Sequence, residues 1–173
     1  AAVDLALAEE LDLLVLDGVG GLGSIAAELN NRPRFELLKM TVNAFRQRRK
    51  EEAVTLVYAG GVRSGTDAAR LIALGASAVV YGVAAALALG GTLSAQGISF
   101  PLDHTADERA AALGALLRAN AGEASMMARC TGKTQLHNLE PEDLRAVTIA
   151  TSTLTGIPLV GHRPARGGNG LAA

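Results

Sequence analysis

The most informative stretch of this chain is Tyr58-Ala59-Gly60-Gly61-Val62-Arg63-Ser64-Gly65-Thr66-Asp67. The apolar run over residues 54–59 predicts a buried strand, and the two glycines end it. Ser64 is a typical N-cap residue, so a helix is expected over residues 66–74, with Gly75 ending it. The amide groups and the positive end of such a helix point to the carboxyl edge of the strand, where they favour an anion.

A second turn of the same kind follows the next predicted strand. Residues 78–81 form another short apolar run that ends at Gly82, and a short helix is expected over residues 84–89. Two consecutive strand-to-helix turns with glycine at the edge can share one phosphate, as the loops after the last strands of a (β/α)8 barrel do. We therefore expect Gly60, Gly61 and Gly82 to bind a phosphate. The alternative is that these glycines only permit tight turns, and Arg63 either pairs with the phosphate or caps the barrel mouth.

A glycine-rich loop follows the strand predicted over residues 13–16. It comprises the candidate substrate-loop residues Asp17, Gly18, Gly20, Gly21 and Gly23. Its glycines would let the backbone approach a planar ligand, but their spacing is not that of a dinucleotide-binding fingerprint. Two questions stay open: the loop is either a ligand contact or a lid without one, and Asp17 either accepts a hydrogen bond from a substrate or caps the loop.

The alternation of helices and strands predicts an α/β fold with parallel strands. A helix expected over residues 35–49 places Leu38, Val42 and Phe45 on one face. Three strands do not close a (β/α)8 TIM barrel, which needs about 250 residues. The chain is therefore expected to carry the C-terminal part of such a barrel, its last three strands, followed by C-terminal helices. It opens without Met inside a helix predicted over residues 3–10, so we expect further residues upstream.

The domain is expected to have three parts. Residues 1–92 would form the strands and helices of the barrel, and residues 163–173 a flexible tail. Residues 93–162 would hold an irregular segment over 92–105 and packing helices over 106–129 and from about 140 to 154. Pro141 at the first helical position and the neighbouring carboxylates favour the start of the last helix.

Composition excludes several classes of function. The 173 residues are 49% hydrophobic and carry a formal net charge of −1, so neither nucleic acid nor a membrane surface is an expected partner. A single cysteine, Cys130, excludes an internal disulfide and fits a cytoplasmic protein; we expect a buried thiol. The three histidines lie far apart without metal-ligand spacing, so no metal site is predicted.

Later motifs give a family resemblance. The glycine turns look like the phosphate end of many FMN barrels. Residues 128–134, 137–148 and 155–161 are similar to the C-terminal helices of the FMN-binding domain of the glutamate synthase family. This resemblance implies FMN as cofactor, with its phosphate end held by Gly60, Gly61, Arg63, Ser64, Gly65, Gly82, Val83 and Ala84.

The resemblance also implies an activity: reductive amination of 2-oxoglutarate to L-glutamate, with ammonia from glutamine. Glutaminase and electron-donor subunits would be partners, in an oligomer. Residues 90–104 contain no cysteine, so an iron–sulfur cluster is not expected from this chain, as in cysteine-poor relatives of the family. The alternatives are an FMN barrel with another amine donor, similar to N-methylglutamate synthase, or a truncated, non-catalytic assembly subunit. No catalytic residue is assigned.

Overall fold

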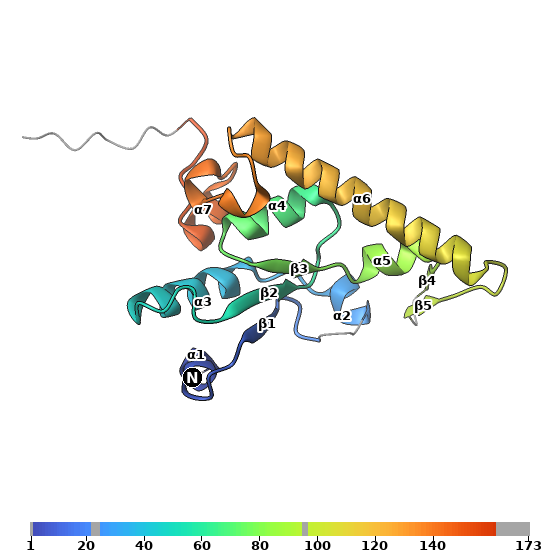
Figure 1. Cartoon of the computed structure of the whole chain (residues 1–173), viewed down its shortest axis with the longest axis horizontal. Coiled ribbons are helices and arrows are strands. Elements are labelled where there is room, and N and C mark those ends of the chain that lie inside the picture. The colour runs from blue at the N-terminus through green and yellow to red at the C-terminus, as the bar shows by residue number, and fades with distance from the viewer. Residues whose placement is uncertain (1, 22–24, 95–96, 162–173) are drawn as a thin grey trace, which may run out of the picture.

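The computed structural model describes residues 2–21, 25–94 and 97–161 (Figure 1). Its elements in chain order are α1 (Ala2–Ala8), β1 (Leu13–Asp17), α2 (Ile25–Asn30), α3 (Phe35–Gln47), β2 (Thr55–Ala59), α4 (Gly65–Ala73), β3 (Ala78–Val80), α5 (Val83–Ala88), β4 (Thr92–Ser94), β5 (Gly97–Ser99), α6 (Ala106–Cys130), the 3-10 turns η1 (Leu136–Asn138) and η2 (Pro141–Asp143), and α7 (Ile149–Thr155). The predicted tail over residues 163–173 lies outside the described residues.

The core lies on one face of a three-stranded parallel sheet of order β1-β2-β3. Leu56 and Tyr58 of β2 point to this face, where they pack with Leu38 and Phe45 of α3. Residues two apart along a strand share a face, so the apolar runs supply both faces of the sheet. The α/β fold and the parallel strands predicted from the sequence are confirmed.

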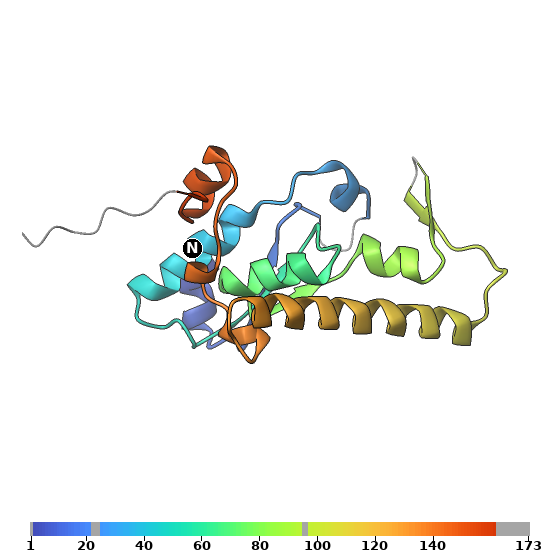
Figure 2. The same cartoon turned by 90° about the horizontal axis from the view of Figure 1, so that it is seen from above.

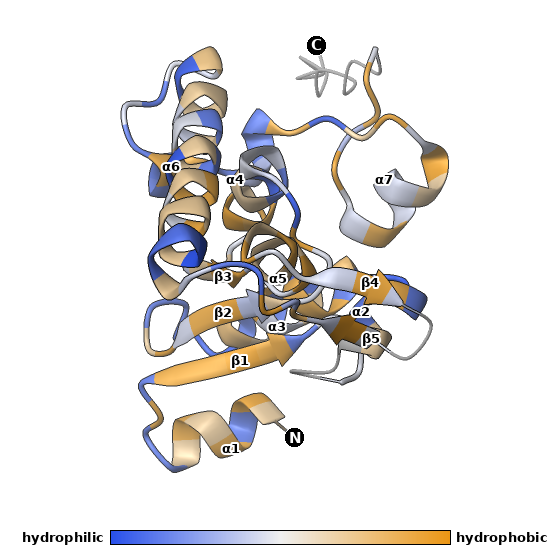
Figure 3. Cartoon of the chain, turned by 90° about the vertical axis from the view of Figure 1, so that its right-hand side faces the viewer, coloured by the Kyte–Doolittle hydropathy of each residue, from blue (hydrophilic) through white to orange (hydrophobic). Residues whose placement is uncertain are grey.

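The opposite face of the sheet is open. Leu13 and Val15 of β1 and Val80 of β3 expose 49%, 37% and 40% of their surface. The register, which pairs Val15 with Val57 and Ala59 with Val80, brings them to the same side. Figure 3 shows β1 as hydrophobic over most of its length, although only one face of it is covered by helices. An exposed apolar face of this kind marks a surface that packs against another protein surface.

The long helix α6 packs along α4 and also contacts α5 (Figures 1 and 2). Small residues permit this approach: Ala69 and Ala73 of α4 meet Ala124 and Ala128 of α6 in a second apolar cluster. A capping box formed by Thr105 and Glu108 begins α6 where the sequence predicts it. No helix in the described ranges is both long and apolar enough to cross a membrane.

Three elements differ from the expectations drawn from the sequence. The segment predicted as irregular contains an antiparallel hairpin, β4–β5, and α2 was not foreseen. The helix expected from about residue 140 to 154 is split: Leu144 is extended after η2, and the backbone of Ala146 bonds to Pro158 and Val160. This pairing competes with helical hydrogen bonds, and Thr148 then caps the separate helix α7.

The expected burial of Cys130 is also wrong, because Cys130 is exposed at the end of α6. The apolar cluster between α4 and α6 is filled by alanines and by Leu139, and Cys130 is not among its residues. The hydrophobic periodicity of the helix does not show whether its last residue lies on the buried or the exposed side.

Candidate functional site

Two glycine turns lie at the carboxyl edge of the sheet, after β2 and after β3. Gly60 and Gly61 have φ angles of +114° and +73°, which L side chains rarely adopt. Ser64 caps α4 by accepting a hydrogen bond from the amide of Asp67 at 3.2 Å, as predicted. The hydroxyl of Tyr81 donates to the carbonyl of Ser64 at 3.3 Å and so ties the second turn to the first.

The glycine-rich loop after β1 packs against the first turn. A Cβ at Gly60 would lie 2.9 Å from Val19, and one at Gly61 would lie 2.4 Å from Pro33. A side chain at Gly60 would push Val19 of the loop away from the turn, and one at Gly61 would meet Pro33, which follows α2. The turn and the loop therefore form one continuous edge.

Asp17 caps this loop. Its Oδ1 accepts hydrogen bonds from the amides of Val19 at 3.0 Å and Gly20 at 2.9 Å, and its Oδ2 accepts one from the amide of Gly21. Three amide donors on one carboxylate fix the backbone of residues 18–21. Of the two roles left open for Asp17, the loop cap accounts for these contacts.

The carboxylate of Glu28 lies directly against Gly82. Oε2 of Glu28, from α2, accepts a hydrogen bond from the amide of Val83 at 3.1 Å, and a Cβ at Gly82 would lie 1.9 Å from the same oxygen. The turn therefore already binds an oxyanion supplied by the chain. Sequence reasoning missed Glu28, because it lies 55 residues from Val83 and has no local motif.

A second carboxylate occupies the start of α4. Glu123 of α6 accepts hydrogen bonds from the amide of Gly65 at 2.8 Å and from the hydroxyl of Thr66. These contacts, above all the one from Thr66, lower the pKa of Glu123. The amide of Arg63 donates to Asp67 at 3.1 Å, so with the amides of Gly65 and Asp67 three amides at this helix start are satisfied internally. Glu123 too was missed, for the same reason as Glu28.

The remaining predicted site residues are placed as follows. A Cβ at Gly18 would lie 2.0 Å from the hydroxyl of Tyr58, so this glycine makes room for the aromatic side chain. Gly20 has open space around it, whereas Gly23 lies outside the described residues. Arg63 is exposed and makes no ion pair within the described part of the chain, and Ala84 lies in the first turn of α5.

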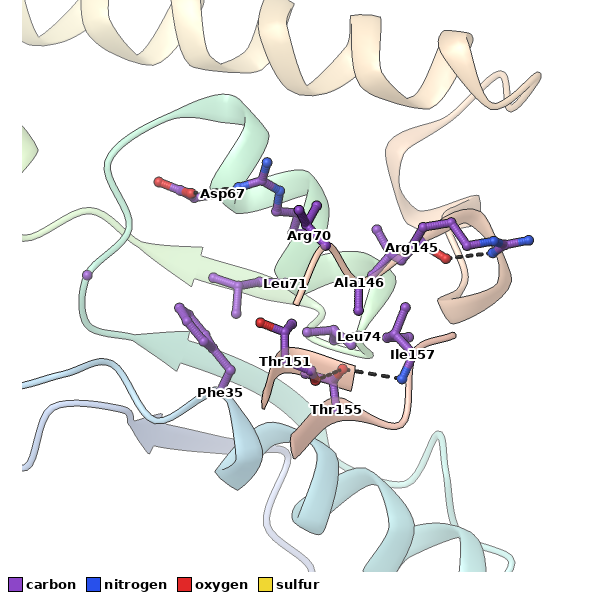
Figure 4. Close-up of a pocket in the computed structure, with 13 residues that line it drawn as sticks. Phe35, Asp67, Arg70, Leu71, Leu74, Arg145, Ala146, Thr151, Thr155 and Ile157 are labelled. Atoms are coloured by element: carbon purple, nitrogen blue, oxygen red, sulfur yellow. Dashed lines mark hydrogen bonds and ion pairs between the residues drawn. The ribbon is translucent and has the colours of Figure 1, made fainter. Parts of the chain in front are cut away.

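A cavity of about 360 Å³ lies next to Gly61, between α4 and α7 (Figure 4). Its lining is mostly apolar and includes Leu71, Leu74 and Ile157. Two charged residues of α4 also line it, Arg70 and Asp67, which form an ion pair with 3.7 Å between Nη1 and Oδ1. Because an apolar lining offers few donors to a phosphate, the glycine edge, and not this cavity, is the candidate anion site. Sequence reasoning gave no sign of the cavity, which depends on the folding back of residues 144–157.

Comparison with known proteins gives a consistent set of matches. The family model described as FMN-dependent dehydrogenase matches residues 32–127, more than half of the chain. The "glutamate synthase large subunit-like protein" of Rhizobium meliloti is 34% identical over 91% of this chain and 43% of its own length. The "archaeal-type glutamate synthase [NADPH]" of Thermotoga maritima is 38% identical over 46% of this chain and 16% of its own length. The chain thus spans less than half the length of these curated relatives.

Two solved structures resemble the fold. A mutant flavocytochrome b2 with pyruvate bound matches with a TM-score of 0.64 and 23% identity, over 94% of this chain and 36% of that one. The recombinant flavin-binding domain of baker's yeast flavocytochrome b2 matches with a TM-score of 0.62 and 21% identity, over 95% of this chain and 35% of that one. At these identities the match concerns the fold alone.

Proposed function

Because this chain belongs to the FMN-dependent dehydrogenase family, and within it is similar to the FMN-binding domain of the glutamate synthases, we propose that its glycine edge holds the phosphate of FMN. The resemblance drawn from the sequence and the cofactor FMN are confirmed by these matches. The class of function is that of a flavin-dependent oxidoreductase.

The observation that most strongly supports the proposed phosphate site is the hydrogen bond from the amide of Val83 to the carboxylate of Glu28. An oxyanion of the chain stands where we place a phosphate oxygen, so the turn has the donor that such a ligand needs. Gly60 and Gly61 lie in the adjacent turn, which Tyr81 ties to Ser64. The chain thus fits the cofactor at its phosphate end, through contacts that we assign to Gly60, Gly61, Arg63, Ser64, Gly82, Val83 and Ala84, with Gly65 seating α4 against α6.

The proposed reaction is the reductive amination of 2-oxoglutarate to L-glutamate. Ammonia, from glutamine, condenses with the keto group, and addition of a hydride to carbon and a proton to nitrogen gives the amino acid. FMN, when bound and reduced, supplies the hydride. The role of this chain is to anchor the cofactor by its phosphate and to place the Asp17-capped loop beside it, at the carboxyl edge where barrel enzymes bind their substrates.

The open sheet face supports a further part of the proposal. Leu13, Val15 and Val80 would lie in the interior of a (β/α)8 barrel that other strands of the full-length protein complete. The shares of 43% and 36% that this chain spans in a relative and in a solved structure agree with a partial barrel.

Flavin binding tests the proposal directly. The full-length protein is purified and its visible absorbance is recorded after FMN is added. We expect a bound-flavin spectrum that is lost in Gly61→Val and Gly82→Val, because both side chains would fill the edge. Gly122→Ala is the control, because nothing beyond its own stretch of helix lies within 4 Å of its Cβ position. A full-length protein that binds no flavin would refute the proposal.

The reaction itself needs its own measurement. The FMN-loaded protein is supplied with 2-oxoglutarate, ammonium and a reduced viologen as electron donor, and L-glutamate is quantified. Replacing ammonium by methylamine tests the other amine donor, for which N-methylglutamate is the product. Formation of neither product by a flavin-loaded protein would leave the oxidoreductase class in place and overturn the proposed substrate.

A further inference from the structure

The Glu28 side chain competes for the position that the proposed cofactor phosphate needs. Its Oε2 accepts a hydrogen bond from the amide of Val83 at 3.1 Å and lies 1.9 Å from the position of a Cβ at Gly82. The absence of a side chain at Gly82 is what lets the carboxylate come this close. One amide donor in such a narrow space serves one oxyanion at a time.

The surroundings of Glu28 allow a ligand to displace its carboxylate. It forms no ion pair with a lysine or arginine of the described residues, and its hydrogen bond is the one from the amide of Val83. It lies half-buried on the short helix α2, which packs against α5 and β5. A glutamate side chain has several rotatable bonds and can swing into solvent without moving its helix.

The charges nearby make the competition electrostatic. Glu28 is joined at this edge by Glu123 and Asp67, which accept hydrogen bonds from backbone amides at the start of α4. A phosphate that carries about two negative charges would be repelled by a carboxylate within hydrogen-bonding distance of the same amide. Its binding therefore requires that Glu28 leave.

We infer that Glu28 is an autoinhibitory contact: its carboxylate occupies the Gly82–Val83 turn and is displaced by the phosphate of FMN, which lowers the affinity of the protein for the phosphorylated flavin. This inference rests on the proposed phosphate site. Glu28 opposes the binding of FMN because it repels the phosphate. It does not oppose the binding of riboflavin, which lacks the phosphate.

The test compares the two flavins. Apoprotein of the full-length chain is titrated with FMN and with riboflavin, and flavin fluorescence gives each Kd. Glu28→Gln keeps the size and removes the charge, whereas Glu28→Ala removes the contact. Glu51→Gln is the matched control, because it removes the same charge from the exposed turn before β2, at the opposite edge of the sheet.

We expect both Glu28 variants to bind FMN about tenfold more tightly, the factor of one charge-assisted hydrogen bond, with riboflavin affinity unchanged. Glu51→Gln should change neither. Equal FMN affinity in wild type and Glu28→Gln, or an equal gain for both flavins, would overturn the inference and leave the phosphate site standing. Failure of every variant to bind either flavin would overturn the site and the inference together.

Discussion

Gly65 is the residue at which an added methyl group should cost the most. A Cβ there would lie 2.1 Å from the carbonyl oxygen of Asn120 and 2.7 Å from the amide nitrogen of Ala124, although real Cβ contacts essentially never fall below 3.0 Å. Both atoms belong to the backbone of α6, so no side-chain rotation relieves the overlap. Gly65→Ala must therefore move α4 and α6 apart.

The size of the effect follows from two opposing terms. Overpacking of this kind costs about 1–3 kcal/mol, and the replacement of a glycine in a helix by alanine returns about 0.5–1 kcal/mol. The separation of the helices also strains the hydrogen bond from the amide of Gly65 to Glu123. We expect Gly65→Ala to lower the free energy of unfolding by about 2 kcal/mol.

Gly122→Ala is the control on α6 itself. Nothing beyond its own stretch of helix lies within 4 Å of its Cβ position, so only the helix-propensity gain remains and the variant should be more stable by about 0.5–1 kcal/mol. Urea unfolding followed by circular dichroism measures both changes. Midpoints that shift in the same direction for the two variants would refute the close approach of α4 and α6.

Three further predictions concern other parts of the molecule. Tyr58→Phe removes a fully buried hydroxyl that has no hydrogen-bond partner among the described residues, so thermal melting should show a gain of about 1 kcal/mol; a loss would mean that the hydroxyl is bonded. The pKa of Glu123 is lowered in the folded state, chiefly by Thr66, so its contribution to stability is present above its ordinary value of 4.5 and is lost as the pH falls through the lower folded value. Acid unfolding curves should accordingly be shallower for Glu123→Gln, and unchanged curves would contradict the cap. The isolated chain should self-associate through the open sheet face, and sedimentation should show less association for Val15→Lys; a monodisperse wild-type monomer would argue against this.

The family match covers the part of the chain that contains the candidate anion site. The matched range over residues 32–127 runs from before α3 into α6 and contains both glycine turns. The turns, the helices that follow them and most of α6, which packs on α4, thus lie within the matched range. The apolar cavity beside Gly61 is lined from both sides of the end of this range: Leu71 and Leu74 lie within it, whereas Leu144 and Ile157 lie beyond it.

The sequence by itself determined what depends on neighbours along the chain. Apolar runs placed the three strands, Ser64 marked the start of α4, and Gly60, Gly61 and Gly82 marked the turns. These signals are readable because capping, turn conformation and strand burial involve residues within a few positions of one another.

Only the tertiary structure decided which groups meet at the edge of the sheet. Glu28 reaches Val83 across 55 residues and Glu123 reaches Gly65 across 58, and neither carboxylate has a local motif. Hydrogen bonds of the Ala146 backbone with Pro158 and Val160 likewise split a segment that its local sequence predicts to be one helix. Contacts of this kind depend on how whole elements pack, and packing energies outweigh the small local preferences that a sequence reveals.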